Sequence, residues 1–166
     1  MSTKKNVVVT IVDKTKKYGQ QVPELTYNIT VEGVSLPDKS TSSLAQYGLE
    51  NMTLQTTATA LSNVGDYAIA LNPGRSGVNG NFDPNNLADA ALLELYTYNF
   101  NNNKTGILTV ERLPVKVTPK NKTVTYGQKI SDIQFDYGYD PKLTYDGGLL
   151  NIIKNAHQSQ MVTNAL

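Results

Sequence analysis

Apolar and polar residues alternate with a period of two along several stretches of this chain, which is the pattern of strands that bury one face. The clearest stretch is 25–31, where apolar side chains occupy every second position and Thr or Asn lies between them. Residues 52–60, 67–71 and 96–100 show the same alternation, the first of them more weakly. Tyrosine and threonine, which favour strands, are frequent throughout. We therefore predict a mainly β protein.

Polar segments between these strands predict one hairpin and one long loop. Residues 101–106, Asn-Asn-Asn-Lys-Thr-Gly, separate the strand 96–100 from a second apolar run that starts at Ile107. We expect these two strands to pair as a hairpin, because the connecting segment has turn composition and ends in Gly. Residues 72–81 are rich in Gly and Asn and form the clearest loop.

Two short helices are expected in addition to the strands. Asp83 is a suitable N-cap and Pro84 suits the first helical position, so we predict a helix from about Pro84 to Leu93. A second apolar run with helical spacing follows Asp146-Gly147-Gly148, which predicts a helix over about 148–158.

An internal repeat organises the chain. Residues 7–20 read VVVTIVDKTKKYGQ and residues 115–128 read VKVTPKNKTVTYGQ, and 8 of the 14 aligned positions are identical without a gap. This alignment places Tyr18 on Tyr126 and so fixes the period of the repeat. Self-similarity at a fixed period indicates an array of like units. In both copies we expect the strand to end in a turn at Tyr-Gly, with Gly supplying a backbone conformation that Tyr avoids.

The repeat divides the chain into a complete unit, residues 5–113, and the N-terminal part of a second, truncated unit, residues 114–166. The second unit holds about half of the expected strands, so we expect it either to pack on the first unit or to be poorly ordered. For each unit we predict a small immunoglobulin-like β-sandwich or a β-grasp-like sheet, with one short helix. The apolar pattern fits both.

Four short motifs follow one another along the chain. The first three are Lys14–Gly19, Pro23–Tyr27 and Val64–Ile69, and the fourth combines Tyr96–Phe100 with Gly106–Val110. Their order resembles the MBG domain of the YGX type, a family of tandem repeats in bacterial cell-surface proteins and adhesins. The similarity covers nearly all of residues 7–118 and restarts at residue 115. The resemblance implies an extracellular structural repeat without catalytic or cofactor-binding residues. The segment 72–94 and the helix near 148–158 look like insertions, placed at different points of the two units.

Composition limits the chemistry that the chain can perform. There is no Cys, and the single His, His157, lies in the truncated unit, so thiolate sites are excluded and zinc and triad sites disfavoured. We expect no enzyme. Scattered charges with a net value of +1 argue against nucleic-acid binding, and no apolar run is long enough for membrane insertion. The apolar run 7–12 is too short for a signal peptide, so we expect any export signal to lie outside this sequence.

Two functions are compatible with these observations. The first is a stalk or spacer module whose partners are the neighbouring repeats of the same chain. The second is an adhesive module that binds a glycan or a host surface protein through the loop 72–86 and exposed tyrosines, with Tyr47, Tyr96 and Tyr98 as candidates. The oxygen-rich loop also offers calcium candidates, namely Asn79, Asn81 and Asp83, but a solvated loop with a helix cap is the simpler interpretation.

Overall fold

The computed structural model describes residues 3–127 and 133–165, and for residues 162–165 it describes the backbone only. The fold is mainly β, as the alternation predicts. Contacts between residues divide the chain into two compact units, here called unit 1 and unit 2, whose bounds differ from those of the two sequence repeats. Unit 2 combines segments from both repeats. Unit 1 comprises Met1–Thr15, Pro23–Ala58 and Gly65–Thr109, and unit 2 comprises Lys16–Val22, Thr59–Val64 and Val110–Leu166.

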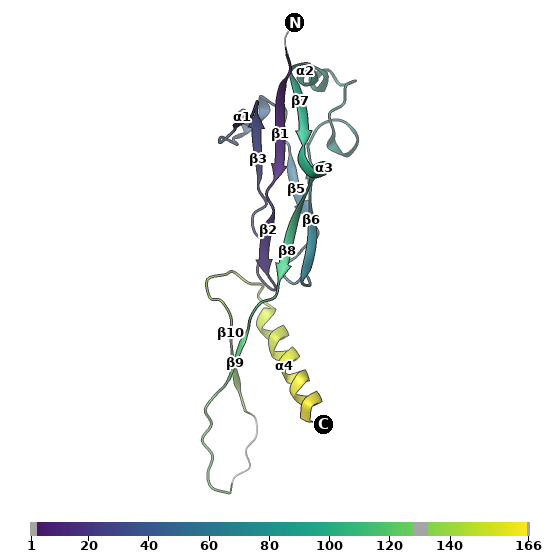
Figure 1. The fold of residues 1–166 in the computed structure, drawn as a ribbon. Helices are drawn as coiled ribbons and strands as arrows, with labels where there is room; N and C mark the ends of the chain where they lie inside the picture. Colours follow the sequence, from purple (N-terminus) through teal and green to yellow (C-terminus); the bar gives the residue numbers. More distant parts are fainter. Residues whose placement is uncertain (1–2, 128–132, 166) are drawn as a thin grey trace. The chain divides into compact units, whose positions relative to one another are not determined.

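One four-stranded sheet is built around the first strand of the chain (Figure 1). Strand β1 (Lys5–Ile11) pairs with β3 (Tyr27–Val31) in antiparallel fashion and with β7 (Tyr96–Phe100) in parallel. The short β4 (Val34–Ser35) adds to the outer edge of β3. Val7 and Val9 are buried because β1 alternates one inward and one outward side chain.

A second four-stranded sheet has the order β2-β8-β6-β5. Its inner face contributes Ile69, Leu71 and Leu108 to the core. Two sheets of this kind match the sandwich alternative better than a single sheet crossed by a helix. The strands are β2 (Lys14–Lys17), β5 (Thr53–Thr56), β6 (Gly65–Asn72) and β8 (Thr105–Glu111).

The expected hairpin between β7 and β8 is wrong, because the two strands belong to different sheets. Between them lies the short segment α3 (Asn101–Lys104), in which Asn102, Asn103 and Lys104 all have positive φ. These left-handed residues deflect the chain from one sheet into the other, a passage common in sandwiches. Asn101 supports the bend by donating from Nδ2 to the Thr10 hydroxyl at 2.6 Å.

The first predicted helix exists but begins later than expected. Helix α2 spans Leu87–Leu95, and its N-cap is Asn86, whose side chain accepts from the Asp89 N–H. Asp83 is not the cap. Its carboxylate instead accepts from the Asn85 N–H at 2.9 Å and forms a turn ahead of the helix. A single-turn 3-10 segment, η1 (Val78–Gly80), lies in the preceding loop.

The repeat is reproduced in strand register. In the first copy Ile11 lies opposite Tyr27, and in the second copy Pro119 lies opposite Phe135. The ungapped alignment of the two repeats places Ile11 on Pro119 and Tyr27 on Phe135, so equivalent residues pair in both copies. The second copy's strands are β9 (Lys116–Pro119) and β10 (Phe135–Gly138).

The second helix starts at an equivalent point of its repeat, which corrects the view of it as an insertion placed elsewhere. Helix α1 (Thr41–Ala45) was not predicted, and the same alignment places its first residue on the first residue of α4 (Leu149–Ala165). An aspartate accepts from a backbone N–H ahead of each helix: Asp38 from Ser40 at 2.9 Å, and Asp146 from Gly148 at 2.8 Å. None of the described helices is long and apolar enough to cross a membrane.

Candidate functional site

The three candidate tyrosines pack together instead of forming an exposed binding surface. Tyr47 and Tyr96 are buried and meet edge to face at 5.1 Å, so their expected exposure is wrong. Tyr98 is half-buried, donates its hydroxyl to the Tyr47 carbonyl at 2.5 Å and stacks on Phe82. Burial raises the pKa of the Tyr98 hydroxyl well above its usual range. The rings pack on one another and on Phe82, and the alternation of residues 96–100 gives no sign of this contact between distant segments.

The loop 72–86 is held by a buried ion pair. Asp89 is fully buried on α2 and accepts from Arg75 at 2.6 and 2.8 Å. It also accepts from the backbone N–H groups of Asp83 (2.9 Å) and Ser76 (3.3 Å). Burial alone would raise the pKa of Asp89, but these hydrogen bonds and the Arg75 charge lower it below its ordinary value. The charges at the loop therefore serve to fix it.

The calcium candidates do not converge in this structure. Asn79 is exposed, Asn81 accepts from the Lys104 ammonium, and the Asp83 carboxylate accepts from Asn85. A cation next to Asn81 would therefore lie near the positive charge of Lys104, which is unfavourable. Among the described residues, no group of three or more His, Cys, Asp or Glu side chains could hold a metal ion.

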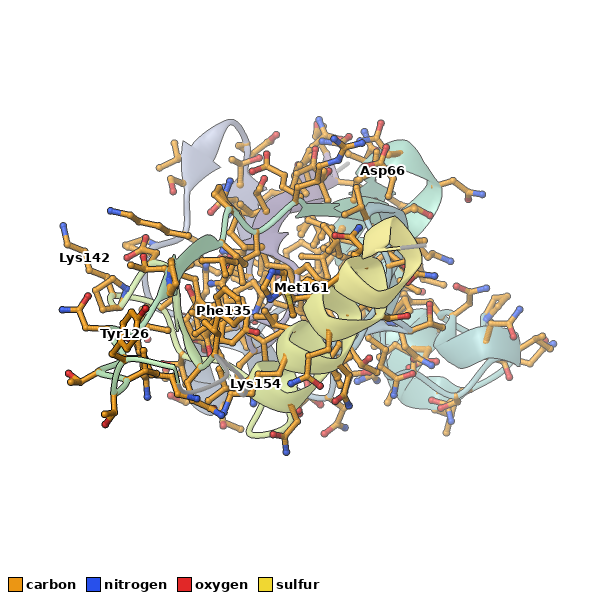
Figure 2. The ribbon with its side chains drawn as sticks, turned by 90° about the horizontal axis from the view of Figure 1, so that it is seen from below. Asp66, Tyr126, Phe135, Lys142, Lys154 and Met161 are labelled. Atoms are coloured by element: carbon orange, nitrogen blue, oxygen red, sulfur yellow. The ribbon has the colours of Figure 1, made fainter. Side chains whose placement is uncertain are left out.

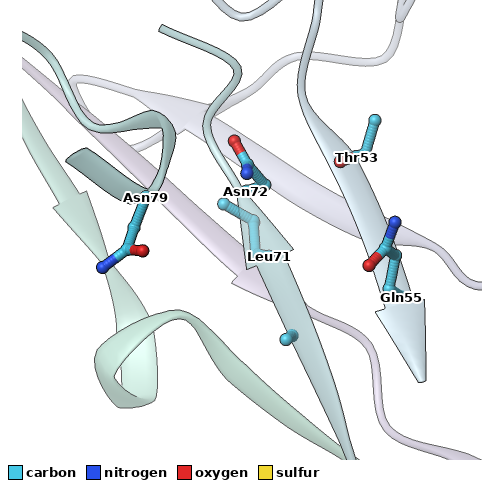
Figure 3. A pocket seen from close by; sticks show the side chains of 6 residues that line it. Thr53, Gln55, Leu71, Asn72 and Asn79 are labelled. Atoms are coloured by element: carbon cyan, nitrogen blue, oxygen red, sulfur yellow. The ribbon is translucent and has the colours of Figure 1, made fainter. Parts of the chain in front are cut away.

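Asn79 instead borders a shallow hollow over β5 and β6 (Figure 3). Its volume is about 230 Å³, and the side chains that border it are mostly amides and hydroxyls. The hollow is lined by Thr53, Gln55, Ala70, Leu71, Asn72 and Asn79.

His157 has a structural setting in unit 2. Its Nδ1 lies 2.9 Å from the Tyr137 hydroxyl, and its ring meets Phe135 edge to face at 4.8 Å. These contacts fasten α4 to β10, and Phe135 lies beside the helix (Figure 2).

A set of backbone hydrogen bonds in unit 2 surrounds the Tyr-Gly turn of the first repeat. Gly19 has a φ of +84°, and its N–H donates to the Ala60 carbonyl at 2.8 Å. The Gly19 carbonyl accepts from the Asp146 N–H, and the Gln21 N–H donates to the Thr144 carbonyl, both at 2.8 Å. These bonds add residues 144–146, from the second repeat, to the turn as a short antiparallel bridge. We call this contact the repeat joint.

Leu149, the first residue of α4, closes the repeat joint. It is fully buried, and a Cβ placed on Gly19 would come within 2.5 Å of its methyl groups. Gly19 is therefore required twice, once for its positive φ and once for the close approach of Leu149. The sequence pattern flagged Gly19 as a turn residue, but nothing in it indicated the partner.

A buried lysine stands beside the joint. Lys16 is 1% exposed, and its ammonium donates to the carbonyls of Lys17 (3.0 Å) and Ala60 (3.1 Å). Burial lowers the pKa of this ammonium. Ala60 thus accepts from both Lys16 and Gly19, which ties the loop 59–64 to the turn. The sequence analysis did not predict that Lys16 is buried. Its inward position agrees with the alternation of side chains along β2, where Thr15 is exposed and Lys16 is buried.

Comparison with known families identifies the fold unit. The MBG domain (YGX type) family matches residues 7–92, about half of the chain. This chain belongs to the MBG domain family. The match includes the Tyr18-Gly19 turn, at which the repeat joint is built. No curated protein and no solved structure matches the chain significantly.

Proposed function

We propose that this MBG chain is a structural spacer module of a large, adhesin-like protein on the bacterial cell surface. Its role is to hold neighbouring units in sequence, and its partners are the adjoining repeats of the same chain. The observation that carries the proposal is the repeat joint. There the turn of the first repeat forms two backbone hydrogen bonds, both at 2.8 Å, with residues 144 and 146 of the second repeat. In an array, stability is a sum of unit terms and such neighbour contacts.

The side chains that could carry chemistry support a structural role. Asp89 and Arg75 fix a loop, His157 fastens α4, and Lys16 donates to two backbone carbonyls. We propose accordingly that the chain is not an enzyme, needs no cofactor, and binds neither nucleic acid nor membrane. The family's association with surface proteins supports an extracellular setting.

A second function, adhesion, is favoured by one observation. The hollow over β5 and β6 is bordered by the amides of Gln55, Asn72 and Asn79, which can hydrogen-bond sugar hydroxyls. It lies against the loop 72–86, where an adhesive surface is expected. The hollow is shallow, and no aromatic ring is among the described residues that line it, so it is a poor platform for a sugar.

An array of glycans and matrix proteins, probed with the full chain with and without calcium, separates the two functions. The spacer function predicts no saturable binding in either condition. Saturable binding that is lost in Asn72→Ala and Asn79→Ala, and kept in the matched exposed variant Asn63→Ala, would replace the spacer with an adhesive module. Circular dichroism of each variant establishes that the fold is retained.

A further inference from the structure

We propose that the edge of β9 that faces away from β10, here called the β9 edge, accepts a further strand, and that its occupant is a strand of the β7 type from the later half of an MBG repeat, running parallel to β9. The inference rests on the proposed spacer function, in which repeats are the partners of this chain. In the first repeat, β1 lies between two strands, β3 and β7. In the second repeat, β9 pairs with β10 alone among the described strands (Figure 1).

The backbone register shows which groups of β9 face this edge. In an antiparallel ladder, residues that exchange hydrogen bonds with the partner strand alternate with residues whose N–H and C=O point away from it. The Lys120 N–H donates to the Gln134 carbonyl at 2.8 Å, so Thr118 also bonds to β10 and the backbone groups of Val117 point away from it. Neither group of Val117 has a backbone partner among the described residues, and all four residues of β9 are exposed.

The first repeat shows what occupies the equivalent edge. The Val12 N–H donates to the Thr26 carbonyl at 2.9 Å, so the same count along β1 directs the backbone groups of Val9 away from β3. On that side lies β7, which pairs with β1 in parallel. The repeat alignment places Val9 on Val117, and the two residues are identical. The β9 edge is therefore the counterpart of the edge that β7 occupies.

The side chains of the first repeat indicate the chemistry of the occupant. Val7 lies opposite Tyr98 and Val9 lies opposite Phe100, so β7 offers an aromatic ring to each valine. Val9 is 1% exposed, whereas the equivalent Val117 is 38% exposed. Aromatic and β-branched side chains pack well on neighbouring strands of a sheet. The occupant is therefore an extended segment with aromatic residues at alternate positions.

The chain contains one β7 strand and two edges that fit it. Its own β7 is already paired with β1, and the repeat alignment places a counterpart of β7 past residue 166. By the order of elements in the first repeat, the later half of an MBG repeat holds a β7 strand without a β1. Such a half and the second repeat of this chain are complementary, because each supplies the strand that the other needs.

The test adds a capped peptide of residues 94–102 to the full, isotope-labelled chain and follows the amide signals by NMR. Free peptide must reach about millimolar concentration, the range that short linkers supply within one chain. We expect saturable shifts of the Val115 and Val117 amides. The same peptide with Tyr98→Ser and Phe100→Ser keeps the backbone and should bind about tenfold more weakly, because two aromatic side chains are no longer buried.

Two variants of the chain block the β9 edge in different ways. Val117→Pro removes the outward N–H and leaves the bonds between β9 and β10 in place, since Pro is tolerated where the N–H of an edge strand faces solvent. Val117→Lys keeps the N–H and replaces the apolar side chain with a charged one. Both variants should abolish the saturable shift of the Val115 amide. Unaltered amide signals of β10 establish that the two strands remain paired.

A nitroxide at the N-terminus of the peptide reports the direction of the bound strand. A parallel strand should broaden the Leu113 amide signal more than the Lys120 signal, because Lys5, the counterpart of Leu113, lies opposite Tyr96. Three results would overturn the proposal: no shifts with peptide 94–102, shifts that persist unchanged in both Val117 variants, or stronger broadening at Lys120.

The outcomes separate this site from the proposed function. Absent shifts together with a silent glycan and matrix array would refute the strand site and leave the spacer function standing. Saturable binding on the array would refute the spacer function, and the peptide shifts would then decide the strand site alone.

Discussion

Gly19→Ala tests the repeat joint at its tightest point. A residue with a side chain is destabilised by about 1 kcal/mol at a left-handed φ such as the +84° of Gly19. The new Cβ would also lie 2.5 Å from the Leu149 methyl groups, so Leu149 must move from a fully buried position. Burial of a leucine contributes about 2 kcal/mol, of which a partial displacement loses about half or more. We expect a total loss of about 2–3 kcal/mol in the free energy of unfolding.

Gly33→Ala is the matched control for the backbone term. Gly33 has a φ of +77°, and its Cβ would meet no described atom within 4 Å. This variant should lose about 1 kcal/mol, the strain alone. Urea unfolding followed by tyrosine fluorescence measures both losses, and amide exchange reports on α4. Exchange in the first turn of α4 should accelerate in Gly19→Ala only. Equal losses in both variants, with α4 protection unchanged, would refute the role assigned to Leu149.

Three further substitutions probe buried polar groups. Asp89→Asn should cost about 3 kcal/mol in urea unfolding near neutral pH, because Arg75 loses its fully buried counter-charge and keeps only the more distant Glu50, at 3.3 Å. Since the pKa of Asp89 is lowered on folding, wild type should also lose stability as pH falls through the acid range, and the variant should lose less. Lys16→Met should raise the free energy of unfolding by about 1 kcal/mol, because a buried ammonium is removed. The pKa of Lys16 is lowered on folding, so wild type should gain stability as pH rises towards 10.5, and the variant should not. Tyr98→Phe should cost about 1 kcal/mol in thermal unfolding, through the lost bond to the Tyr47 carbonyl.

Each of these has an outcome that contradicts it. An Asp89→Asn chain as stable as wild type would mean that the Arg75 pair contributes nothing to the loop. A Lys16→Met chain with an unchanged pH profile would show that Lys16 titrates normally. Unchanged thermal stability in Tyr98→Phe would mean that the Tyr98 hydroxyl of the wild type is bound to solvent and not to the Tyr47 carbonyl.

Strand existence was predictable from sequence because period-two burial is a local property. The alternation in 25–31 and 67–71 marks β3 and β6, whose inward residues Ile29 and Ile69 are buried. Strand pairing was less predictable, because alternating apolar residues mark a strand and do not indicate which of the two sheets it joins. The β7–β8 hairpin failed for this reason: three successive left-handed residues at 102–104 deflect the chain, and such residues normally occur singly.

The site was harder to predict than the fold because it depends on contacts between distant segments. Gly19 and Leu149 belong to different repeats, far apart in the chain, and neither has a local signal that points to the other. The tyrosines were expected on the surface because Tyr tolerates both environments, whereas in the structure they pack on one another and Tyr98 stacks on Phe82. The repeat period was the one long-range signal, and it located the equivalent Tyr-Gly turns; the equivalent starts of α1 and α4 were not predicted from it.

The central claim, that the Tyr-Gly turn of one repeat holds the segment ahead of the next helix, can be tested by a disulfide. Gln20 and Tyr145 face each other in an antiparallel bridge flanked by its two hydrogen bonds, a pair with a Cα separation of about 4.5 Å, within the reach of a disulfide. The chain has no cysteine of its own, so Gln20→Cys/Tyr145→Cys gives an unambiguous readout by mass spectrometry under mild oxidation. Nearly complete intramolecular bonding, with the single-cysteine variants remaining as monomeric thiols, is the predicted result. Free thiols or bonds only between molecules would contradict the account.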